Sequence, residues 1–127
     1  MINLLTMVSH FCNVSGKVVW EIRLYVDNRR RMPVEDFIGQ LPEEDQARVR
    51  AAIKFLGEVG NGLREPQSKS LGGGLFELRV RSRRIFYCFL RTGIIVLLHG
   101  FTKKTQRTPP GQLAIGYKRM EEVKHEK

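Results

Sequence analysis

The chain has 127 residues, the size of one compact domain, and its 42% hydrophobic content can form an ordinary core without disulfide or metal staples. No run reaches the ~18 apolar residues of a spanning helix, so a membrane-embedded protein is not expected. Lysine and arginine (22) outnumber aspartate and glutamate (13), and the formal net charge is +9. This excess favours nucleic acid, an anionic membrane surface or an acidic protein as the partner.

The cysteines and histidines do not form a recognisable metal or disulfide pattern. Cys12 and Cys88 are too few for a disulfide framework, and their separation does not match metal-ligand spacing. We therefore expect a reduced, cytoplasmic setting. No metal site and no cofactor are expected either, because the three histidines are scattered along the chain. They are His10, His99 and His125.

The N-terminus has a weaker pattern than the rest. Residues 1–16 contain a short apolar patch, but no lysine or arginine precedes it, which argues against a secretory signal. We expect residues 1–16 to be an N-terminal extension and residues 17–127 to form one domain.

The first half of the domain predicts one strand and two helices. Residues 18–26 alternate between apolar and polar side chains, as in a half-buried strand. Residues 34–41 can form a short helix. After Pro42, three acidic residues and an apolar stripe that includes Phe55 predict a longer helix, which ends at Gly60.

The second half predicts a three-strand meander and a final helix. Residues 60–74 are rich in glycine, proline and serine and predict a flexible connection; their Gly-Gly-Gly run lacks the spacing of a P-loop. A helix is expected from Gln112 onward. The expected strands are 75–81, 83–90 and 94–101, with Ser82 and Arg83 at the tip of the first hairpin.

This order of elements describes an α+β domain. We expect an antiparallel sheet built from the N-terminal strand and the meander, with two helices packed on one face and a C-terminal helix. The opposite face of the sheet is then expected to be open to a ligand.

Basic residues gather on that open face. Residues 79–107 contain eight lysines and arginines and no acidic residue. Solvated arginines and lysines that deter strand-edge pairing are the alternative explanation, but the lack of acids favours a polyanion site, because guanidinium forks suit phosphate oxygens. The candidate RNA-binding residues are Arg81, Lys103, Arg107, Tyr87, Phe86 and Lys69.

Two further candidates remain open. His99 ends an apolar strand, where a histidine is either hydrogen-bonded structurally or available for proton transfer. Phe86 and Tyr87 point to opposite faces of one strand, so one belongs to the core and the other is available to stack a base; periodicity does not decide which.

Residues 71–120 closely resemble the RelE/HigB-like toxins of bacterial type II toxin–antitoxin systems, in particular their phage-derived branch. The motifs that carry the resemblance are "LFELR", then "RIFY", then "HGFTKKTQRTP". The resemblance implies a RelE-like fold and a metal-independent endoribonuclease that cuts mRNA on the ribosome. It also implies an antitoxin partner, usually a helix-turn-helix protein.

The resemblance also implies catalytic residues. Arg79, Arg84 and Lys104 match the basic residues that stabilise charge, while His99 and Glu77 are candidates for proton transfer. Glu77 is a departure, since RelE has lysine at that position. We prefer an orienting role for it, because a carboxylate among arginines is a weak base.

Two other functions remain as alternatives. A ParE-like toxin would have the same fold and poison DNA gyrase without cutting RNA. A non-catalytic phage protein would bind nucleic acid in a salt-sensitive way and release no cleaved product.

Overall fold

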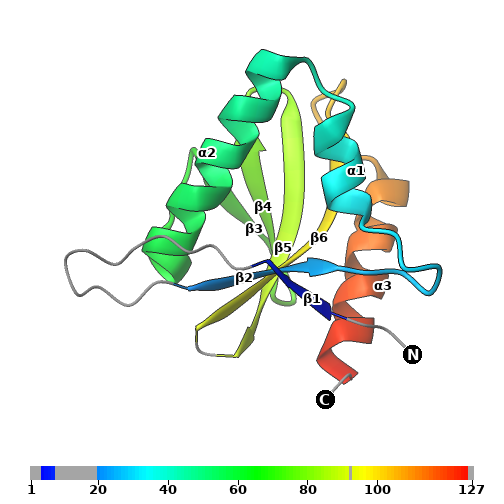
Figure 1. Ribbon diagram of the computed structural model, residues 1–127. Coiled ribbons are helices and arrows are strands. Elements are labelled where there is room, and N and C mark those ends of the chain that lie inside the picture. The colour runs from blue at the N-terminus through cyan, green and yellow to red at the C-terminus, as the bar shows by residue number, and fades with distance from the viewer. Residues whose placement is uncertain (1–3, 8–19, 92, 126–127) are drawn as a thin grey trace.

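A computed structural model describes the backbone of residues 4–7 and all of residues 20–91 and 93–125. The described residues form three α-helices and a β-sheet. Figure 1 shows the helices arranged around the sheet. The elements in chain order are β1 (Leu4–Met7), β2 (Glu21–Tyr25), α1 (Pro33–Gly39), α2 (Glu43–Val59), a 3-10 turn η1 (Gly60–Gly62), β3 (Ser68–Gly72), β4 (Leu75–Val80), β5 (Arg83–Arg91), β6 (Ile94–Thr102) and α3 (Pro110–His125).

The sheet has six strands in the order β1-β2-β6-β5-β4-β3. This confirms the α+β class, the meander of β4, β5 and β6, and the C-terminal helix. The prediction of a wholly antiparallel sheet was wrong, because β2 pairs with β6 in parallel. The sheet is therefore mixed, since the long path through α1, α2 and the meander returns the chain to β6 in the direction of β2.

Three local predictions also need correction. The tip of the β4–β5 hairpin is Arg81 and Ser82, since Val80 pairs with Arg83. Strand β3 lies within the predicted flexible connection. Strand β1 lies within the predicted extension. The remaining residues of that extension, and residues 18–19 of the first predicted strand, lie outside the described part of the chain.

The connection before β4 is ordered by specific contacts. The Ser68 Oγ lies 2.6 Å from the Tyr87 Oη, which fixes β3 against the core. The three glycines 72–74 all have positive φ angles, as a tight turn between β3 and β4 requires. The Tyr117 hydroxyl of α3 donates to the carbonyls of Leu71 and Gly72, at 2.9 and 2.8 Å. The Gly-Gly-Gly run is thus part of a hairpin turn that hydrogen bonds from α3 hold in place.

One core cluster lies between the sheet and helices α1 and α2. Ile22 of β2, Val49 of α2 and Ile85 of β5 are fully buried in it. The apolar spacing of α2 therefore predicted its buried face, with one exception: Phe55 is 48% exposed and is not part of the core.

A second core cluster lies on the opposite face, beneath α3. Phe86 of β5, Leu98 of β6 and Val123 of α3 are all fully buried there. Gly116 permits the close approach, because a Cβ at this position would lie 2.6 Å from the Phe86 ring. The prediction of one open sheet face was wrong, because α3 packs on that face. The basic residues gather instead at the β4–β5 turn and just after β6.

Candidate nucleic-acid site

The β4–β5 turn and the end of β6 form a basic pocket of about 660 Å³. Lys103 follows β6 directly, and its amide donates to the Ser82 carbonyl at 2.7 Å, which holds the two segments together. Arg81 takes a left-handed φ of 58°, as tight two-residue hairpin turns require. The structure thus brings together residues that lie about twenty positions apart in sequence. Those that line the pocket are Arg81, Ser82, Arg84, Lys103, Lys104, Thr105 and Gln106.

A buried carboxylate lies on the α3 side of the sheet, next to this pocket. The Glu77 side chain is 1% exposed, and its Oε1 accepts from the Arg79 Nε at 3.0 Å. The Arg84 Nε lies 3.7 Å from the same oxygen. Thr108 donates from its hydroxyl to the other oxygen, Oε2, at 3.3 Å. Glu77 therefore holds two guanidinium groups in place, which matches the orienting role expected from the sequence.

Arg84 is the more enclosed of the two arginines. Its side chain is 13% exposed, and its Nη1 donates to the carbonyls of Arg81 and Arg83. Burial lowers the pKa of Arg84 from its usual value; Glu77 opposes this shift and Arg79 adds to it. The result is a fixed cation at the wall of the pocket, and a fixed cation loses little side-chain freedom when it binds a phosphate.

The neighbouring arginine, Arg83, serves the other face of the sheet. Its Nη2 donates to an Asp45 carboxylate oxygen of α2 at 2.8 Å, and its Nη1 donates to the Thr102 hydroxyl at 2.6 Å. Because successive residues of a strand alternate in direction, only Arg84 of this pair lies at the pocket.

His99 lies under α3, with both ring nitrogens occupied. Its Nε2 is bonded to the Gln112 side-chain oxygen, and its Nδ1 lies 3.3 Å from the Arg119 Nη1. Since an arginine can only donate, Nδ1 accepts and Nε2 carries the proton. Burial is the main cause that lowers the pKa of His99; the bond to Gln112 opposes the shift and Arg119 adds to it. The geometry is that of a neutral, structurally bonded histidine.

The aromatic candidates of β5 are both buried. Phe86 belongs to the cluster beneath α3 and Tyr87 to the cluster beneath α1 and α2. The expectation that one of them is free to stack a base is therefore wrong for this conformation, because the sheet is covered on both faces. Burial also raises the pKa of the Tyr87 phenol.

The two remaining candidates lie outside the pocket lining. Lys69 is exposed on the edge strand β3, where it is the cross-strand partner of Glu77. Arg107 is exposed in the segment between β6 and α3. That segment also supplies Thr108, a contact of Glu77 that sequence reasoning missed because no periodicity marks it. Gln112 and Arg119, the partners of His99, were missed for the same reason.

The described residues contain neither a metal-ligand cluster nor a membrane-spanning helix. Residues 20–91 and 93–125 contain no group of three His, Cys, Asp or Glu side chains arranged to hold a metal ion. None of the helices in the described part of the chain is both long and apolar enough to cross a membrane.

Comparison with known proteins identifies the family. A family model described as "Phage derived protein Gp49-like (DUF891)" matches residues 36–121. The match runs from α1 into α3, so it includes the basic pocket and Glu77. None of the curated proteins matches the chain. The chain therefore belongs to the Gp49-like family of phage-derived proteins.

Proposed function

We propose that this protein is the toxin of a type II toxin–antitoxin pair, an endoribonuclease that cuts mRNA, on the ribosome, in the cytoplasm. The observation that carries the proposal is the pocket at the β4–β5 turn, where Arg84, Lys103 and Lys104 converge beside the Glu77–Arg79 pair. Membership of a phage-derived family and the resemblance to RelE/HigB-like toxins agree with it.

The reaction is a transesterification within RNA. The 2′-oxygen of one nucleotide attacks the adjacent phosphorus and the bond to the 5′-oxygen breaks, which leaves a 2′,3′-cyclic phosphate and a 5′-hydroxyl. The 2′-hydroxyl proton is lost and a proton is gained by the departing oxygen. Negative charge grows on the phosphorane oxygens, and fixed donors aimed at them can each contribute on the order of 3 kcal/mol. Arg79, Arg84 and Lys104 are the donors.

The site offers few side chains that can transfer a proton. The described residues that line the pocket include no carboxylate and no imidazole. Glu77 is enclosed by its donors, and His99 can act on RNA only after its Nε2 leaves Gln112. The protein therefore contributes chiefly through charge stabilisation and substrate positioning.

The partner implied by this surface is an acidic antitoxin segment. A +9 chain with an open cationic pocket would be neutralised by carboxylates that occupy the same pocket as the RNA phosphates. A helix-turn-helix protein is the expected carrier of that segment.

Brief induction of the protein in growing cells tests the proposal. The wild type should arrest growth and create new mRNA 5′ ends within translated frames. Arg84→Ala and Lys104→Ala should do neither; Lys104 is exposed, so its loss should not affect folding. The matched control is Arg91→Ala, an exposed arginine at the far end of the same strand as Arg84, which should behave as wild type.

A non-catalytic nucleic-acid-binding protein is the second candidate. The occupied nitrogens of His99 and the buried hydroxyl of Tyr87 favour it, because neither group is free to move a proton in this conformation. It predicts salt-sensitive RNA binding with intact mRNA. Growth arrest with intact mRNA and broken DNA would instead identify a gyrase poison.

A further inference from the structure

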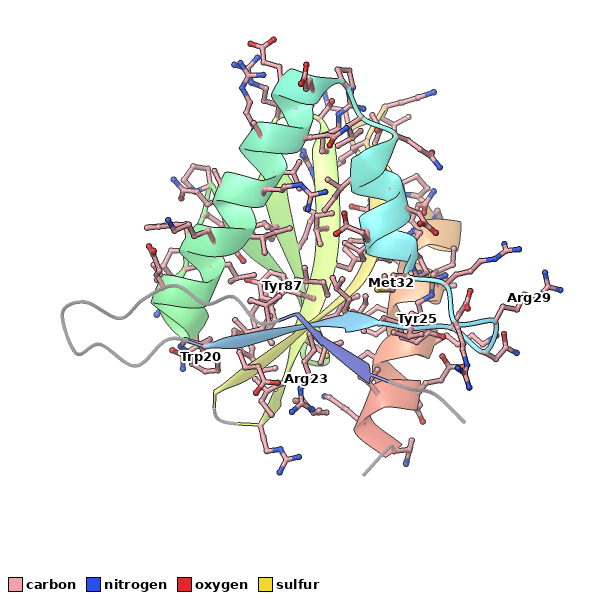
Figure 2. All side chains as sticks on the ribbon, viewed as in Figure 1. Trp20, Arg23, Tyr25, Arg29, Met32 and Tyr87 are labelled. Carbon is pink, nitrogen blue, oxygen red and sulfur yellow. The ribbon has the colours of Figure 1, made fainter. Side chains whose placement is uncertain are left out.

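A second cationic surface lies at the turn between β2 and α1. Arg29, Arg30 and Arg31 are consecutive and all exposed. Figure 2 shows the Arg29 side chain extended away from the body of the molecule. The side chains of Arg29 and Arg30 make no hydrogen bond or ion pair with the described part of the chain. Three guanidinium groups therefore project from one tight turn.

The turn is held in one conformation by Asp27. One oxygen of its carboxylate, Oδ1, accepts from the amides of Arg29 and Arg31, at 2.9 and 2.8 Å. The Asp27 amide donates to the Arg31 carbonyl, and the Arg30 amide donates to the Asp27 carbonyl, both at 2.9 Å. Arg30 has a φ of 64°, the left-handed conformation that such a turn needs. The backbone positions from which the three arginine side chains extend are thus set before any ligand arrives.

Helix α3 extends this surface. A pocket of about 240 Å³ separates the turn from the helix, and Lys118 and Arg119 lie on its α3 side. Both acids at the pocket are engaged: Asp27 in the turn, and Glu122 with the Tyr25 hydroxyl at 2.6 Å. The lining residues are Tyr25, Asp27, Asn28, Ile115, Lys118, Arg119 and Glu122.

We propose that the Arg29–Arg31 turn, with Lys118 of α3, is a second binding site for the RNA backbone, separate from the pocket where cleavage occurs. Figure 1 places this turn beside α3, well away from the β4–β5 turn. Exposed arginines suit phosphate oxygens, which they bind by paired hydrogen bonds. The surface lacks the apolar centre of a protein interface: the large hydrophobic side chain exposed in the described residues is Phe55, on α2. The inference rests on the proposed function only in taking RNA as the polyanion.

A bipartite RNA site should distinguish long RNA from short RNA. The probes are a 2′-O-methyl hairpin of about 16 base pairs and a 2′-O-methyl strand of about six nucleotides, neither of which can be cleaved. The double variant Arg29→Gln/Arg31→Gln should bind the hairpin about tenfold more weakly than wild type and lower the slope of log K against log salt by about 2. Its affinity for the short strand should stay within about twofold of wild type.

The matched control removes the same charge elsewhere. Arg64→Gln/Arg91→Gln removes two exposed arginines, one in the connection before β3 and one at the end of β5, and should keep most of the hairpin affinity. Equal losses in the two double variants would overturn the inference, as would an equal loss on both RNA lengths. A loss of affinity for polyglutamate with unchanged hairpin binding would assign the turn to an acidic protein and also overturn it. These binding results do not depend on whether the wild type cuts RNA, so the two proposals can fail separately.

Substitution of Asp27 separates the shape of the turn from its charge. Asp27→Asn and Asp27→Ala both remove one negative charge, but only asparagine keeps an oxygen that can accept from Arg29 and Arg31. If the held turn matters, Asp27→Ala should bind the hairpin about fivefold more weakly than Asp27→Asn. Equal affinities of the two variants would show that only net charge counts and would overturn the claim of a built site.

Discussion

Glu77→Gln separates an orienting carboxylate from a catalytic base. Loss of one partner from a buried ion pair costs about 3–5 kcal/mol, and the low end applies because Arg79 and Arg84 are 25% and 13% exposed. With about 2.1 cal/mol/K of unfolding entropy per residue, 127 residues give about 0.27 kcal/mol/K. A loss of about 3 kcal/mol therefore lowers the melting temperature by about 11 °C.

The assay combines thermal unfolding with RNA cleavage below the melting temperature of the variant. We expect both stability and cleavage to fall, because the two guanidinium groups lose their anchor. The control is Glu58→Gln, an exposed glutamate of α2, which should change neither. A melting temperature within about 2 °C of wild type together with lost cleavage would refute the reasoning and make Glu77 a chemical base.

Three further predictions concern the packing of α3 and the ion pair between β5 and α2. Burial lowers the pKa of His99 from its ordinary value of 6.5, so the unfolded chain binds a proton more readily than the folded one. Stability should therefore fall as the pH drops below 6.5, and His99→Gln should flatten the dependence of the urea midpoint on pH. Gly116→Ala should destabilise by about 1–3 kcal/mol in denaturant titration despite the better helix propensity of alanine, whereas Gly111→Ala, with open space around it, should not destabilise. Arg83→Ala should lower stability by about 1 kcal/mol through loss of its ion pair with α2 and keep RNA cleavage, unlike Arg84→Ala at the next position.

Local patterns predicted most elements of the fold. The two-residue alternation of Phe76, Leu78 and Val80 predicted strand β4 because those side chains pack against α1 and α2, and the acidic start of α2 predicted its first turn. Strand β3 was not predicted, since its own sequence does not alternate and its place depends on pairing with β4 and on the contact of Ser68 with Tyr87, 19 positions later. The parallel pairing of β2 with β6 was not predicted either, because it depends on the path of the chain through the helices and strands that lie between these two strands.

The site was predictable in part. A run of basic residues without acids pointed to the strand ends where Arg84, Lys103 and Lys104 line a pocket. The prediction of a helix from Gln112 onward did not indicate that this helix would bury Phe86 and enclose His99. Whether a sheet face is open or covered depends on how a distant helix docks, and one sequence does not contain that information directly.

The chemical nature of the cleaved RNA ends tests the central claim most directly. Purified protein, added to translating ribosomes with a defined mRNA, should produce fragments that end in a 2′,3′-cyclic phosphate and begin with a 5′-hydroxyl. Arg84→Ala and Lys104→Ala should leave the mRNA intact, while Arg91→Ala should cut it like the wild type. Intact mRNA with the wild-type protein, or fragments that begin with a 5′-phosphate, would contradict the proposed attack by the 2′-hydroxyl.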